Sequence, residues 1–169
     1  MDFEHFTVIK EQAEFDLANK DKVWPTCWVK RRTGNMIGLA FPSGNDAEKQ
    51  YNILKLKRAI QKLDATSYLL VLEVWTSSIP NIPPRLSDSK EEQVMFVLND
   101  GEKEQTEFWP ISRKEDGSGY FTEPAPNDVD MISGAMADLF DMSDFKTLSY
   151  TQKRKIDQAV NKMLKGKFA

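Results

Sequence analysis

One carboxylate lies inside the most apolar run of the sequence. Glu73 interrupts the segment 68–75, in which apolar side chains fall on both alternating sets of positions. A strand of this kind is covered on both faces in the middle of a sheet, so Glu73 is expected to point into an interior, where an unpaired carboxylate is costly. Such a carboxylate can be a metal ligand, or a general acid or base with a raised pKa. A catalytic function would therefore depend on Glu73.

The chemistry that Glu73 could perform needs companions. No acid with a distinctive spacing accompanies it, and the acids on the strands expected beside it are Asp100, Glu104 and Glu107. The opposing interpretation is an ion pair near the end of the strand. The cations that could form this pair are Lys30, Arg85 and Arg113. We favour the ion pair, and keep a carboxylate-based hydrolase or nuclease that uses Glu73, with or without a metal ion, as the alternative function.

The residue types that are scarce exclude several other chemistries. His5 is the only histidine, which excludes catalytic triads, Cys–His dyads and histidine-rich metal sites. The sequence has no Walker loop and no dinucleotide-binding fingerprint. Asp128 and Asp130 fit the first turn of a helix, where acids interact favourably with the positive end of the dipole. We therefore predict no metal site and no cofactor, and favour a protein that is not an enzyme.

A proline-rich loop follows the strand that carries Glu73. The segment 77–91 contains three prolines and cannot form a regular element. Loops of this length usually bind something or are disordered, and proline lowers the entropy that is lost on binding. The binding side chains predicted in this loop are Ile79, Ile82, Arg85 and Leu86. The leading hypothesis is a non-enzymatic macromolecular interaction or regulatory protein, whose partner is another protein or a second copy of the chain.

The end of the chain is basic. Residues 151–169 hold six basic residues and one acid, a balance of +5, so the net charge of −3 leaves −8 for the rest of the chain. A helix here could neutralise phosphates, and its candidate nucleic-acid contacts are Lys153, Arg154, Lys155 and Lys162. However, the rest of the chain is acidic, and Phe168 is the only aromatic residue after Tyr150. Nucleic-acid binding through this helix is therefore the second alternative.

The elements that must position these residues follow from hydrophobic periodicity. Helical spacing predicts helices over 6–17, 45–63, 127–140 and from 149 onward, the last with the capping-box pair Ser149 and Gln152. Strands are predicted over 23–30, 36–41, 67–76, 93–98, 105–111 and 120–122, with a hairpin turn at 99–102. The order α-β-β-α-β-β-β-β-α-α predicts a single α+β domain over 1–169. Its largely antiparallel, or mixed, sheet of five to six strands has helices packed against it, and residues 149–169 form a basic amphipathic helix.

Composition indicates where the protein works. Of 169 residues, 40% are hydrophobic and 29% are charged, which is typical of a globular chain. No apolar run approaches the roughly 20 residues that cross a bilayer, and the first residues are acidic where a secretory signal is basic. A single cysteine, Cys27, permits no internal disulfide. We therefore expect a cytoplasmic protein that does not bind membranes.

One short block resembles other proteins. Glu73-Val74-Trp75, followed by Pro84-Arg85-Leu86-Ser87 and by Glu91-Glu92 before a strand, is similar to a block in small uncharacterised bacterial and bacteriophage proteins. In those proteins, a strand that ends in an acid, a small residue and tryptophan precedes a loop with proline, serine, arginine and glutamate. The resemblance covers residues 73–92. It implies a bacterial or bacteriophage mobile-element origin and brings no activity with it.

Overall fold

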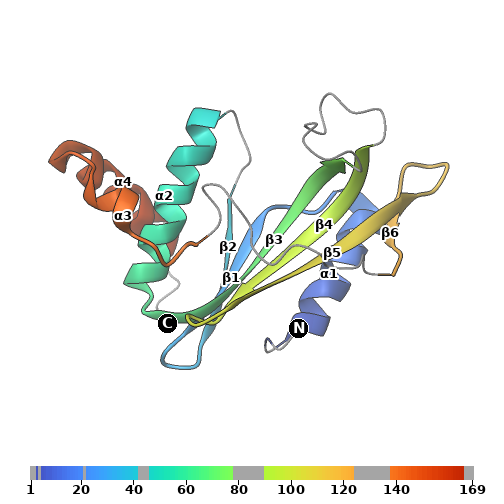
Figure 1. Ribbon diagram of the computed structural model, residues 1–169, viewed down its shortest axis with the longest axis horizontal. Coiled ribbons are helices and arrows are strands. Elements are labelled where there is room, and N and C mark those ends of the chain that lie inside the picture. Colours follow the sequence, from blue (N-terminus) through green and yellow to red (C-terminus); the bar gives the residue numbers. More distant parts are fainter. Residues whose placement is uncertain are drawn as a thin grey trace. The chain divides into compact units, whose positions relative to one another are not determined.

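The described part of the chain forms an α+β fold. A computed structural model describes residue 3 and residues 5–20, 22–41, 46–77, 90–123 and 138–165. These ranges form four helices and a six-stranded antiparallel sheet with the strand order β2-β1-β3-β4-β5-β6 (Figure 1). The predicted fold class and element order are confirmed. The residues gather into two compact units, which are described in turn.

The first unit packs helix α1 (Phe6–Lys20) against strands of the sheet. Its strands are most of β3 (Ala65–Ser77) and β4 (Lys90–Asn99), together with β5 (Glu104–Arg113) and β6 (Gly119–Phe121). Ile9, Ala13 and Leu17 are buried on one face of α1, as their spacing predicts. The opposite face leaves Val8 and Phe15 exposed, although both are apolar.

An aromatic cluster forms the centre of the first unit. Phe96 is fully buried on β4. It makes an edge-to-face contact with Phe6 of α1, with ring centroids 5.3 Å apart, and another with Phe121 of β6 at 6.3 Å. The ring of Trp109 lies 5.7 Å from that of Phe121. Gly119 lets β6 lie close to both β5 and α1. A Cβ atom at this position would lie 3.1 Å from Ile111 Cγ2 of β5 and 3.4 Å from Leu17 Cβ of α1.

Strand β3 is covered on both faces along only half of its length. Residues 68–71 are buried, residues 72–74 are partly exposed, and Trp75 is 53% exposed. The expectation of a strand covered throughout is therefore wrong for the half that contains Glu73. One physical reason is length, since β3 has thirteen residues and its neighbour β1 (Thr26–Arg31) has six, so that β1 cannot accompany all of β3.

The second unit packs a helical pair beside the remaining strands. It contains β1, β2 (Met36–Ala40), α2 (Asp46–Lys62), α3 (Ser143–Lys146) and α4 (Tyr150–Leu164). Helices α2 and α4 lie side by side (Figure 1). Each of these helices buries a stripe of apolar side chains at helical spacing. These residues are Ile53, Leu56, Ile60 and Leu63, and Ile156, Val160 and Leu164.

The connection into the helical pair differs from the prediction. The helix predicted over 127–140 falls mostly outside the described residues, and residues 138–140 form a turn instead of helix. This turn is held by Tyr68, whose buried hydroxyl accepts hydrogen bonds from Leu139 N at 3.0 Å and from Asn99 Nδ2 at 3.3 Å. Residues 143–146, which lie between the helices predicted over 127–140 and from 149 onward, form the single helical turn α3. Asp141 supports this turn, because its Oδ1 accepts a hydrogen bond from Ser143 N at 2.9 Å.

Two further observations concern the single cysteine and the possibility of a membrane-spanning helix. Cys27 is completely buried, and burial raises the pKa of its thiol, so that the residue acts as an inert packing side chain. Among the helices that the structure describes, none combines the length and the apolar character needed to cross a bilayer.

Candidate functional site

Glu73 binds a backbone amide. Its Oε1 accepts a hydrogen bond from Val23 N at 2.5 Å, and Val23 itself is buried. Burial raises the pKa of Glu73, and the negative charge of Glu92 also raises it. The Val23 hydrogen bond and the positive charges of Arg113 and Lys22 act in the opposite direction, and the pKa remains above its ordinary value.

Arg113, one of the three cations predicted as partners of Glu73, forms an ion pair with Glu92, and a pair between Glu73 and Arg85 stays a prediction. Arg113 lies close enough to lower the pKa of Glu73, but it binds Glu92 through two hydrogen bonds. These join Arg113 Nε to Glu92 Oε2 at 3.1 Å and Arg113 Nη2 to Glu92 Oε1 at 2.6 Å. Of the other predicted partners, Lys30 belongs to the second unit and Arg85 lies outside the described residues. Across the described ranges, no three or more His, Cys, Asp or Glu side chains gather as a metal site.

Two substitutions separate the charge of Glu73 from its hydrogen bond. Because burial raises the pKa of Glu73, the folded chain binds this proton more tightly than the unfolded chain does. The stability that results is complete below the unfolded pKa of 4.5 and is lost as the pH rises through the folded pKa. We expect Glu73→Gln, which keeps an acceptor for Val23 N, to be at least as stable as the native protein at neutral pH. Glu73→Ala should cost about 1–3 kcal/mol, because a buried N–H loses its acceptor.

Urea unfolding of the native protein and both variants, at about pH 4 and about pH 7, measures these differences. The advantage of Glu73→Gln over the native protein should grow between the two pH values. An alanine variant as stable as the native protein would show that the Val23 hydrogen bond contributes nothing.

The residues predicted in the proline-rich loop cannot be placed. Ile79, Ile82, Arg85 and Leu86 lie outside the described residues, as do Asp128 and Asp130. They remain predictions from the sequence.

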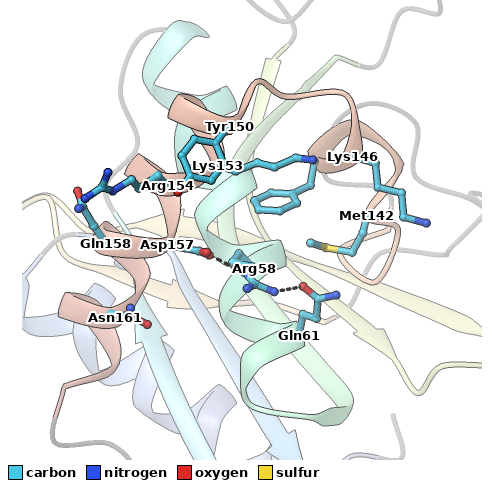
Figure 2. Close-up of a pocket in the computed structure, with 11 residues that line it drawn as sticks. Arg58, Gln61, Met142, Lys146, Tyr150, Lys153, Arg154, Asp157, Gln158 and Asn161 are labelled. Carbon is cyan, nitrogen blue, oxygen red and sulfur yellow. Dashed lines mark hydrogen bonds and ion pairs between the residues drawn. The ribbon is translucent and has the colours of Figure 1, made fainter.

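A basic groove lies on the second unit between helices α2, α3 and α4 (Figure 2). We call it the α2–α3–α4 groove, and its volume is about 540 Å³. Helix α2 contributes Arg58 and Gln61, and the α3 segment contributes Met142, Phe145 and Lys146. Helix α4 contributes one face along three turns, which consists of Tyr150, Lys153, Arg154, Asp157, Gln158 and Asn161.

The start of α4 is fixed by the predicted capping box. Ser149 Oγ accepts a hydrogen bond from Gln152 N at 3.2 Å, and Gln152 Oε1 accepts one from Ser149 N at 2.9 Å. The helix therefore begins at Tyr150, whose side chain is 79% exposed. The next groove residue, Lys153, follows one turn later on the same face.

Polar bonds join the three helices around the groove. Arg58 Nε donates to Asp157 Oδ1 at 2.6 Å, and Arg58 Nη1 donates to Gln61 Oε1 at 2.5 Å (Figure 2). The buried Lys57 binds Asp144 at 3.1 Å, which ties α3 to α2. Further pairs at the far end join Lys62 Nζ to Asn161 Oδ1 at 2.7 Å and to Asp157 Oδ1 at 3.7 Å.

The groove is electropositive. It is lined by four basic side chains and one acid, Asp157. The hydrogen bond from Arg58 holds the pKa of Asp157 below its ordinary value, so this acid is ionised at neutral pH and already paired. Lys146, Lys153 and Arg154 form no ion pair with any residue that the structure describes. No described acid neutralises these three charges.

The structure divides the four basic residues predicted from the sequence. Lys153 and Arg154 line the groove, whereas Lys155 and Lys162 of the same helix do not. Sequence reasoning missed Arg58, Gln61 and Phe145, because their positions on α2 and α3 show no motif. One signal could have revealed the pairing. Asp157 is the only acid in the basic segment 151–169, which indicates that it has a particular cation to bind.

The chain matches none of the protein-family models, curated proteins and solved structures with which it was compared. The fold and site define an α+β protein with a basic, partly aromatic groove between helices. The function has to be inferred from this groove.

Proposed function

We propose that the protein is a non-enzymatic interaction protein that binds an acidic segment of a partner protein in the α2–α3–α4 groove. The observation that carries this proposal is a set of three cations, Lys146, Lys153 and Arg154, that form no ion pair with a described residue and lie beside the exposed ring of Tyr150. Positive charge steers an acidic partner to the groove. Tyr150, Phe145 and Met142 then offer the apolar contacts that are typical of the centre of a protein interface.

The length of the groove fits a short extended segment. The α4 residues that line it run from Tyr150 to Asn161. At 1.5 Å per residue this face is about 16 Å long. An extended peptide advances about 3.3 Å per residue, so about five residues of a partner can lie along the groove.

The distribution of charge favours a peptide over a nucleic acid. The three cations lie on α3 and on the first half of the α4 face, whereas three amide side chains line the remainder, namely Gln61, Gln158 and Asn161. A nucleic acid carries charge at every phosphate, and its regular repeat would set phosphates beside Asp157 and these amides. A peptide can set its acids against the cations and its backbone against the amides. The net charge of −3 also disfavours a general nucleic-acid binder.

Fluorescence anisotropy with defined probes tests the proposal. The probe is a labelled, acetylated and amidated peptide in which a few glutamates are separated by leucine and glycine. We expect the protein to bind it, and the affinity to fall several-fold between about 0.05 and about 0.3 M sodium chloride, because exposed charges are screened. The matched control peptide has glutamine at each glutamate position and should not bind.

Two further measurements identify other outcomes. An oligothymidine of similar length that binds more tightly than the glutamate peptide would favour the nucleic-acid alternative and reject the acidic-segment proposal. Self-association, in which a second copy supplies the acidic segment, would appear as concentration-dependent sedimentation of the protein alone. If neither the glutamate peptide nor any acidic probe binds, the proposal is wrong.

A further inference from the structure

Arg58 has hydrogen-bonding capacity that the protein does not use. A guanidinium group has five N–H donors. Arg58 uses Nε for Asp157 and one Nη1 hydrogen for Gln61. Its Nη2 group binds no acceptor among the residues that the structure describes. The side chain is 25% exposed and lines the groove.

The orientation of this guanidinium is set in advance. Asp157 and Gln61 hold it from α4 and α2, on either side of the groove (Figure 2). The ring of Phe145 lies 5.6 Å from the guanidinium carbon and adds a cation–π contact. Asp157 is in turn near Lys62. A side chain that is already held loses little further freedom when it binds a ligand.

We infer that Arg58 is the residue that recognises an acidic side chain of the partner, by donating two hydrogen bonds from Nη1 and Nη2 to its carboxylate. This inference rests on the proposed function and names its specificity-determining residue. The planar fork of arginine matches the two oxygens of a carboxylate, which a lysine cannot do. Asp157 and Gln61 are positioning residues, because they hold the fork without contacting the partner's carboxylate.

The inference gives Arg58 a different task from the other basic residues. Lys146, Lys153 and Arg154 attract any anion by charge, and this contribution weakens as salt screens it. The contribution of Arg58 depends on geometry and is made by a partly buried group, so that salt weakens it less. Substitution by lysine keeps the charge of Arg58 and removes only the fork.

Arg58→Lys tests this assignment with the glutamate peptide used above. We expect the dissociation constant to rise about tenfold or more, because one bidentate pair becomes a point contact. The dependence of affinity on salt should stay close to that of the native protein. Lys153→Gln, the matched control, should instead reduce the salt dependence and have a smaller effect on affinity at high salt. Circular dichroism spectra verify that both variants fold.

A double-mutant cycle between protein and peptide locates the contact, and remains informative if Arg58→Lys lowers stability. Each glutamate of the peptide is replaced by glutamine in turn, and each peptide is titrated against the native protein and Arg58→Lys. Replacement of one particular glutamate should lower the affinity of the peptide for the native protein but not its affinity for Arg58→Lys. Because the peptide is amidated, such a loss belongs to a side-chain carboxylate and not to a chain terminus.

The outcomes separate the inference from the proposed function. Binding by Arg58→Lys with native affinity, or an equal loss at every glutamate position in both proteins, would overturn the assignment of Arg58 while acidic-peptide binding stands. Failure of the native protein to bind the glutamate peptide would reject both.

Discussion

Replacement of Lys153 and Arg154 by glutamate is expected to abolish most binding of an acidic peptide. Both side chains line the α2–α3–α4 groove, and neither forms an ion pair with a described residue. Each reversal removes an attraction and introduces a repulsion, and contacts at an exposed rim are worth about 1 kcal/mol each. We therefore expect a loss of about 2 kcal/mol, or roughly thirtyfold in Kd. Fluorescence anisotropy of the glutamate peptide at low salt measures it.

The chain offers a matched control on the same helix. Lys155 and Lys162 are exposed on α4 but do not line the groove. Replacing both by glutamate changes the net charge by the same amount as the first double variant. If attraction depended on the overall charge of the helix, as nucleic-acid binding through all four residues would require, the two double variants would lose affinity equally. We expect the control to retain most of its affinity, and an equal loss would reject the groove as the binding surface.

Phe96→Ala is expected to have the largest effect on stability. The ring is completely buried and contacts Phe6 and Phe121 edge to face. Its removal loses the transfer free energy of an aromatic ring and leaves a cavity between α1 and the sheet, at a cost of about 3–5 kcal/mol. This is a large part of the roughly 5–15 kcal/mol that stabilises a typical domain. Urea unfolding followed by tryptophan fluorescence measures the loss, because Trp109 lies in the same cluster.

Phe15→Ala provides the control for this prediction. Phe15 belongs to the same unit and lies on α1, but its side chain is 58% exposed. Its removal leaves no cavity inside the protein and should change the free energy of unfolding by less than about 0.5 kcal/mol. A large loss for Phe15→Ala would mean that the outer face of α1 is covered in solution. A small loss for Phe96→Ala would contradict the assigned core.

The fold was predictable from the sequence where its local signals agree. Helical periodicity located α1, α2 and α4, and the capping-box pair Ser149 and Gln152 gave the start of α4 to the residue. The turn at 99–102 was also predictable, because glycine follows Asn99 and Asp100 there. Gly101 adopts a positive φ of 90°, and the N–H of Gly101 donates a hydrogen bond to Asn99 Oδ1 at 2.8 Å. These features depend on neighbours within a few residues, which a sequence shows directly.

The candidate site was less predictable because it depends on long-range pairs. The apolar character of residues 72–75 did not reveal that this half of β3 is partly exposed, since exposure depends on the lengths of other elements. Arg113 was one of three candidate partners of Glu73, and the sequence did not show that it binds Glu92 through two hydrogen bonds. Lys153 and Arg154 were identified by charge. Their division from Lys155 and Lys162 required knowledge of which face of α4 meets α2.

The contact between Arg58 and Asp157 joins residues 99 positions apart in the chain. Closing a loop of this size has an entropic cost that must be met before the contact can form. During synthesis, Arg58 leaves the ribosome long before Asp157, and for that interval the α2 side of the groove lacks the opposite side that α4 provides. The groove therefore forms only when α4 packs against α2, so the proposed capture of an acidic segment has to follow that step.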